Sequence, residues 1–259
     1  MTADETAFLA ALPDWSFAFA LLMARAGSLC LLLPGIGEAE LPTTIRLGFA
    51  LALSALLLPV VAPLVASGPA DTWRFAAMLV GEIVTGLWLG WITRLWLLAL
   101  PVAGQVIAAM MGLANVLQPD PALGPQTAAV SRALALAAPV VVLASGLYAL
   151  PLAALAGSYR LVAPGAVLPA GDTAETVVRA VAAAFSLSLQ LAAPFVLGAI
   201  VWHGATGLLA RLVPQFQVFF AAMPAQILGG LAALGLLGGV LIDTWHARVG
   251  EAFAALPGL

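Results

Sequence analysis

The 259-residue sequence contains no lysine, and charged residues of all kinds make up only 8% of it. Soluble domains carry about 25% charged residues, because their surfaces face water. The net charge is −3 and there is no run of basic residues, which excludes the electrostatic footprint of a nucleic-acid-binding protein. With 63% hydrophobic residues, the composition predicts an integral membrane protein that does not bind nucleic acid.

Cysteine and histidine are almost as scarce as lysine. Cys30 is the single cysteine, so the chain cannot form an internal disulfide or a cysteine-based metal site. The two histidines, His203 and His246, are far apart, and we expect His203 to be a hydrogen-bonded packing residue. The sequence has no HExxH, Gly-x-Ser-x-Gly, P-loop or Gly-x-Gly-x-x-Gly motif. It therefore predicts no catalysis, no cofactor and no metal site.

Long apolar segments separated by proline- and glycine-rich connectors fill the chain. We predict an all-α, polytopic membrane fold of about six long helices, since a span needs about 20 apolar residues. The many prolines inside the apolar runs favour broken or hairpin helices that pack against partners. Arginines are divided almost evenly between alternate connectors, so charge bias does not assign the orientation. The predicted segments are approximately 15–33, 43–66, 72–100, 127–156, 173–209 and 218–242.

Two charges lie inside the predicted spans. Glu82 shares a helix face with Gly86 and Gly90, and this Gly-x-x-x-Gly pair allows another helix to approach closely. Arg25 interrupts the first segment. The two charges could form a buried pair; alternatively, Arg25 could extend to the interface while Glu82 is protonated and hydrogen-bonded.

The stretch from 101 to 126, PVAGQVIAAMMGLANVLQPDPALGPQ, is too polar and too broken for a span. On a helical wheel its small and amide-bearing residues gather on one face, opposite an apolar face. That face suits either a tight helix–helix seam or a surface facing a pore that must close. Methionine fits the second interpretation because its flexible thioether fills irregular gaps. The residues of this face are Gly104, Gln105, Ala108, Met111, Gly112 and Asn115.

Five blocks of the sequence, in order, resemble the R-type (FliR-like) family of bacterial flagellar and type III export-gate proteins. Three positions depart from the family pattern: Met110 stands where glutamine is common, Leu147 replaces a histidine, and Ala222 replaces a glycine. The resemblance covers nearly the whole chain. The blocks are Arg25 with PGIG (34–37) and Pro42, RLGFALALSALLLP (46–59), GEIVTGLWLG (81–90), AGQVIAAMMGLANVLQPDP (103–121) and RLVPQFQVFFAAMP (211–224).

The resemblance implies a non-catalytic structural and gating subunit of the flagellar protein-export channel. Residues 1–259 would form a single domain, with a P-type-like portion (about 1–210) and a Q-type-like C-terminal hairpin (about 211–259). Expected partners are the P-type and Q-type gate subunits (FliP and FliQ), the B-type export protein, unfolded export substrates and membrane lipid. The expected location is the bacterial inner membrane, within the flagellar basal body and projecting to the periplasmic side.

The resemblance also assigns roles to residues. The plug that closes the pore would be the loop 104–121, with Gly104, Gln105, Met110, Met111, Gly112 and Asn115. Packing between helices or subunits would involve Arg25, Glu82, Gly86, Gly90, Arg211, Pro214, Gln215, Pro224, Gly235 and Gly239.

Two alternatives stay open at this point. One is a proton-coupled small-molecule secondary transporter that uses His203 or Glu82, although no inverted repeat is apparent. The other is the equivalent subunit of a virulence injectisome. The Met-Gly-Leu and Asp-Pro elements favour the flagellar protein over this alternative.

Overall fold

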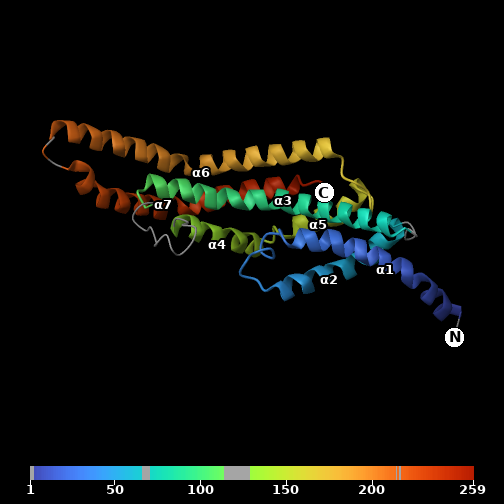
Figure 1. The fold of residues 1–259 in the computed structure, drawn as a ribbon. Helices are drawn as coiled ribbons and strands as arrows, with labels where there is room; N and C mark the ends of the chain where they lie inside the picture. The colour runs from blue at the N-terminus through green and yellow to red at the C-terminus, as the bar shows by residue number, and fades with distance from the viewer. Residues whose placement is uncertain (1–2, 66–70, 114–128, 214, 216) are drawn as a thin grey trace. The chain divides into compact units, whose positions relative to one another are not determined.

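A computed structural model describes residues 3–65, 71–113, 129–213, 215 and 217–259. Within these residues every regular element is helical, which confirms the all-α prediction (Figure 1). The fourth predicted segment is divided into two helices, and the other five each correspond to one long helix. The elements are α1 (Ala3–Cys30), α2 (Thr43–Val61), the 3₁₀ helix η1 (Ala62–Leu64), α3 (Thr72–Met110), α4 (Ala129–Ala144), α5 (Ala149–Leu161), α6 (Ala170–Leu212) and α7 (Val218–Ala254).

Two helices extend beyond their predicted ends. We expected α3 to stop before Pro101, but it continues to Met110, because a proline inside a helix removes only one backbone hydrogen bond. The Ser131 hydroxyl donates to the Pro101 carbonyl at 2.7 Å and supports the helix at this point. The predicted end of α7 at 242 is also wrong. Trp245, Val249 and Phe253 recur every fourth residue and are fully buried, so the apolar stripe of α7 continues through its polar tail.

The break in the fourth segment does not lie at a proline. α4 and α5 are bent by 70° at residues 145–148, where Gly146 adopts a φ of +78°. Glycine accepts this left-handed conformation without a steric penalty. Pro139, one of the two positions where the sequence suggests a kink, lies inside α4. Pro151, the other, lies in the first turn of α5, where a missing N–H has no helical partner to lose.

Four helices of the described residues are long and apolar enough to cross a membrane: α2 with η1, α3, α6 and α7. The bent pair α4–α5 would be a fifth, which agrees with a polytopic membrane protein. The described part of α1 is not among these candidates. It carries Asp14 and Arg25, and several of its apolar side chains, such as Leu21, Leu22 and Leu29, are buried against the rest of the chain.

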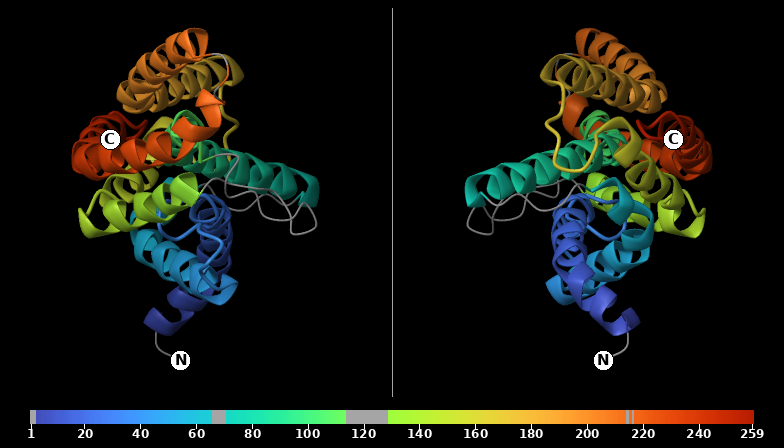
Figure 2. Two further views of the ribbon diagram at one scale, coloured as in Figure 1. Left: turned by 90° about the vertical axis from the view of Figure 1, so that its left-hand side faces the viewer. Right: turned by 90° about the vertical axis from the view of Figure 1, so that its right-hand side faces the viewer.

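The chain forms two compact units. Unit 1 comprises residues 1–94, 142–179 and 251–259, and unit 2 comprises residues 95–141 and 180–250. In unit 1, α1 and α2 lie side by side, as both end views show (Figure 2). Leu22, Val61 and Tyr159 form a buried cluster there. In unit 2, α7 lies alongside the second half of α3.

Candidate functional site

The candidate site lies in unit 2, at the end of α3. The N–H of Gly112 donates to the Ala109 carbonyl at 3.2 Å, and the N–H of Leu113 donates to the Ala108 carbonyl at 3.0 Å. These two bonds, together with the φ of +76° at Gly112, form a Schellman motif, the commonest way for a glycine to end a helix. Gly112 therefore fixes the direction in which the chain leaves α3.

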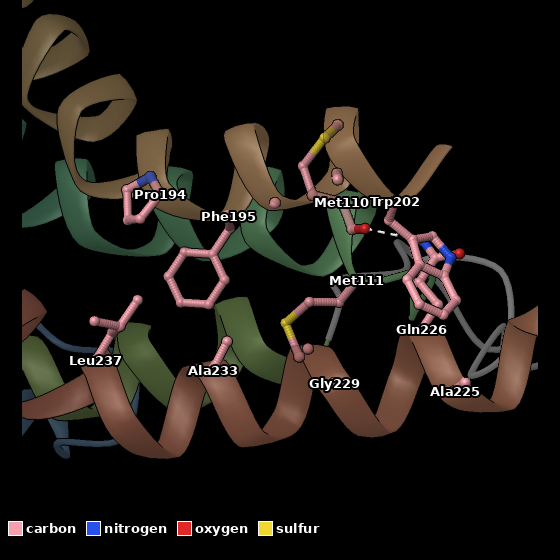
Figure 3. A pocket seen from close by; sticks show the side chains of 13 residues that line it. Met110, Met111, Pro194, Phe195, Trp202, Ala225, Gln226, Gly229, Ala233 and Leu237 are labelled. Carbon is pink, nitrogen blue, oxygen red and sulfur yellow. Dashed lines mark hydrogen bonds between the residues drawn. The ribbon is translucent and has the colours of Figure 1, made fainter. Parts of the chain in front are cut away.

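The last carbonyl of α3 is satisfied by a side chain from α7. The amide nitrogen Nε2 of Gln226 donates to the Met110 carbonyl oxygen at 3.0 Å (Figure 3). The same amide covers Gly112, since a Cβ at that glycine would lie 3.4 Å from Nε2. Gln226 is not among the residues predicted from the sequence. A polar residue inside an apolar segment was the available signal, because such residues in membrane helices are rarely placed without a partner.

Met111 packs against α7 one turn further along. Its side chain is buried, at 2% exposure, and lies across α7 beside the Gln226 contact (Figure 3). A Cβ at Gly230 would lie 2.6 Å from Cγ of Met111, so only glycine leaves room for the methionine. The end of α3 is thus held through its main chain at Met110 and through its side chain at Met111.

An apolar cavity of about 230 Å³ adjoins the methionine pair. Phe195 and Trp202 line it from α6, Leu237 lines it from α7, and Met110 and Met111 close the side toward α3 (Figure 3). The lining is largely apolar, with Gln226 as a polar member, and it leaves the flexible thioether of Met110 space to change rotamer.

The base of the site is a close helix–helix contact. A Cβ at Gly104 would lie 2.8 Å from Cα of Ser131 on α4, so α3 and α4 touch through their backbones. Ala108 is fully buried on the same face, whereas Gln105 is exposed. Asn115, the remaining member of the predicted face, lies outside the described residues. On the described part of that face, the small residues make a seam within the chain.

At the other end of the contact between α3 and α7, a second hydrogen bond joins the two helices. The indole N–H of Trp245, a fully buried residue, donates to the Trp96 carbonyl at 3.1 Å. Gln226 and Trp245 therefore hold the second half of α3 at its two ends.

Unit 1 contains a buried ion pair. Nε of Arg25 donates to Oε2 of Glu82 at 2.6 Å, and a second guanidinium nitrogen donates to Oε1 at 3.0 Å. Both side chains are 0% exposed. Of the two possibilities left open by the sequence, the structure shows the pair. A bidentate arginine–carboxylate pair is among the strongest polar contacts in proteins.

Neighbouring groups satisfy the rest of both charges. Arg25 also donates to the Ser158 hydroxyl at 3.0 Å and to the Val162 carbonyl at 3.1 Å. Its guanidinium carbon lies 4.0 Å from the centre of the Tyr159 ring, at cation–π distance. The N–H of Gly165 donates to Oε1 of Glu82 at 2.6 Å. The cluster thus joins α1, α3, α5 and the connector after α5.

The glycine pair beside Glu82 brings α1 against α3. A Cβ at Gly86 would overlap the Arg25 carbonyl oxygen and the Ser28 hydroxyl, and one at Gly90 would lie 3.0 Å from Cβ of Leu32. The predicted seam is therefore occupied by another helix of the same chain. A second pair, Arg94 with Glu38, joins α3 to the α1–α2 connector through two hydrogen bonds, and the sequence analysis did not find it.

Residues 16–252 match the family model for bacterial export proteins, family 1. The chain belongs to this family. Three proteins named flagellar biosynthetic protein FliR are among its relatives. The one from Caulobacter vibrioides is 34% identical over 90% of this chain and 92% of its own length. Those from Bacillus subtilis and Escherichia coli are 27% and 23% identical, over 81% and 79% of this chain and 82% and 77% of their own lengths. Together they support a flagellar export subunit.

The remaining predicted packing residues of this bacterial export protein face outward. Arg211, Gln215 and Pro224 are exposed, and Pro214 lies outside the described residues. Gly235 and Gly239 are exposed on α7, and a Cβ at either would meet no atom within 4 Å. If these glycines pack against a helix, that helix is not one of the described helices of this chain.

The surroundings of His203 and of the possible metal ligands can be described in this member of the family. Nδ1 of His203 is 2.8 Å from the Ala199 carbonyl oxygen of its own helix, so the expected hydrogen bond is present. The expected packing role is wrong, because His203 lies on an exposed face of α6. Across the described ranges, no group of three or more His, Cys, Asp or Glu residues is placed to hold a metal ion.

Proposed function

We propose that this chain is a non-catalytic structural and gating subunit of the flagellar protein-export channel in the bacterial inner membrane. Its membership of bacterial export proteins, family 1, supports the export role, and relatives named flagellar biosynthetic proteins support the flagellar one. Four to five candidate membrane spans support the location.

The gating role rests on one observation: the end of α3 is fixed at a methionine pair that borders an apolar cavity. We propose the stretch 104–121 as the plug. Gly104 and Met111 form its packed base, and Gly112 sets its exit from α3. Gln105 is exposed and Met110 borders the cavity, which supports a position of both residues on the surface that faces the pore.

The chain would act within an assembly with P-type and Q-type subunits and the B-type export protein. The exposed glycines of α7 support a contact with another subunit, since they leave room for a close helix approach. The division into a P-type-like portion (1–210) and a Q-type-like hairpin (211–259) belongs to the same proposal.

The lengths of three helices support a projection beyond the membrane. α3, α6 and α7 contain 39, 43 and 37 residues. At 1.5 Å per residue, their contour lengths are about 55–65 Å, roughly twice the thickness of about 30 Å of a bilayer's hydrocarbon core. We propose that the excess lies on the periplasmic side.

A leak measurement tests the plug. We expect the double variant Met110→Ala, Met111→Ala to copurify with its partner subunits and to let ions or small solutes pass the inner membrane. Met223→Ala, which truncates an exposed methionine of α7, is the matched control and should not leak. Loss of copurification without leak in any remaining complex would make the methionines packing residues and would refute the plug role.

No observation favours the transporter alternative. Glu82 is fully buried and accepts hydrogen bonds from Arg25 and from the Gly165 N–H. His203 forms a hydrogen bond with a carbonyl of its own helix. Neither group faces a described cavity, as a proton-coupling residue would need to.

A further inference from the structure

We propose that Gln226 and Gly230 of α7 are positioning residues that fix the end of α3, and with it the direction of the chain at Gly112. This inference deepens the proposed function. Its consequence for export rests on that function, whereas the positions of the two helices do not. The geometric part can be tested separately.

The first step concerns the main chain. In the Schellman motif, Gly112 and Leu113 use the carbonyls of Ala109 and Ala108. No later N–H of α3 donates to the Met110 carbonyl, because the helix ends there and the chain turns at Gly112. Gln226 donates to this carbonyl. A side chain of α7 thus completes the hydrogen bonding of the helix end.

The second step concerns the side chains. Gln226 and Gly230 are four residues apart and therefore lie on one face of α7. They contact consecutive residues, Met110 and Met111. Gly229, the neighbour of Gly230, lies on another face, since a Cβ there would meet no described atom within 4 Å. The contact is therefore specific to one face of α7.

The third step connects this face to the exit of the chain. The Gln226 amide lies over Gly112, within 3.4–3.9 Å of the position that a Cβ would take. Gly112 is also the residue whose φ of +76° sets the turn. A displacement of α7 would therefore move the carbonyl, the methionine and the turn together. We infer that α7 controls the orientation of the α3 end.

A thiol-accessibility experiment tests the geometry without reference to export. Leu113→Cys places a thiol directly after the turn, in a full-length chain whose single native cysteine is Cys30, 1% exposed. With Cys30→Ser as background, the maleimide modification rate is measured in membranes. We expect Gln226→Met, which keeps the volume but removes the donor, to raise this rate at least tenfold. Gln190→Met, which removes an exposed amide of α6 bonded to Ser186, should leave it unchanged.

Substitutions at the adjacent glycines Gly229 and Gly230 give an independent test. We expect Gly230→Ala to raise the rate at Leu113→Cys several-fold, because its methyl group would displace Met111. Gly229→Ala has the same chemistry with open space and should have no effect. A Cβ at Gly230 would also lie 2.9 Å from Cβ of Met111, so only loss of both atoms removes the clash. Adding Met111→Gly to Gly230→Ala should therefore return the rate to that of Met111→Gly alone.

The outcomes separate this inference from the plug. An unchanged rate in Gln226→Met overturns the role of Gln226. Equal effects of the two glycine variants, or failure of Met111→Gly to suppress Gly230→Ala, overturn the role of Gly230. A raised rate without any ion leak supports the positioning role while contradicting the plug. If Gln226→Met does not accumulate in the membrane, the glycine arm decides whether this face of α7 positions α3.

Discussion

At the scale of single residues, the Arg25–Glu82 pair has the most consequences. Two opposite charges at 0% exposure are tolerated only because each is paired and hydrogen-bonded. Val162 and Gly165, which complete the hydrogen bonding, belong to the chain after α5. The pair therefore specifies which segments meet around α1, in addition to any stability that it contributes.

Removal of one partner should destabilise the chain by about 3–5 kcal/mol, since it leaves an uncompensated buried charge. We expect this cost for Glu82→Leu and for Arg25→Met. The double variant should be less destabilised than the sum of the two, because no charge is left unpaired. Unfolding in mixed micelles, titrated with SDS, gives the three free energies.

The control for this cycle is the exposed pair Glu175–Arg179, whose side chains are 64% and 72% exposed. Exposed ion pairs contribute about 0–1 kcal/mol, so the coupling should be much smaller there than for Arg25–Glu82. Additive single effects at Arg25 and Glu82 would show that the charges do not depend on each other.

At the scale of elements, the contact of α7 with α3 is the feature that places the site. Trp245 anchors it at one end through a fully buried indole. Trp245→Ala should cost about 3–5 kcal/mol, as for other large-to-small core changes. Trp245→Phe keeps most of the volume and should cost about 1 kcal/mol for the lost hydrogen bond.

The same SDS titration measures both Trp245 variants. Trp91→Ala, at a tryptophan that is 45% exposed on α3, is the control and should have a small effect on the free energy of unfolding. An alanine variant at position 245 that is as stable as the Trp91 variant would mean that α7 does not depend on this anchor.

The elements also show what the sequence could and could not predict. Apolar runs and their connectors predicted six segments, and spacing predicted the face of Glu82, Gly86 and Gly90. Periodicity identifies a face but not the surface that covers it. The occupant of that seam, α1, was therefore indicated only by the possible pairing of Arg25 with Glu82.

The predicted ends of α3 and α7 were wrong for a related reason. Pro101 and the polar residues after 242 indicate ends locally, but packing of α4 and the buried stripe of α7 outweighs them. Gln226 is the clearest omission. Its role depends on a carbonyl more than a hundred residues earlier in the chain, which no local pattern reveals.

At the scale of the whole molecule, the exposed apolar surface needs an explanation. Leu228, Leu236 and Val240 of α7 are 63–81% exposed, and they can face lipid or another subunit. Lipid tolerates a change in side-chain size, whereas a close helix contact does not, because small residues let the backbones approach. The glycines of α7 distinguish the two situations.

We expect Gly235→Val combined with Gly239→Val to reduce copurification of the partner subunits at least fivefold while the chain still accumulates in the membrane. Among the described residues, no atom lies within 4 Å of a Cβ at either position, so we would attribute a loss to an intermolecular contact. Gly48→Val on α2 has the same open surroundings and is the control for helix propensity. Normal copurification of the double variant would assign this face of α7 to lipid and would leave the partner contact to other helices.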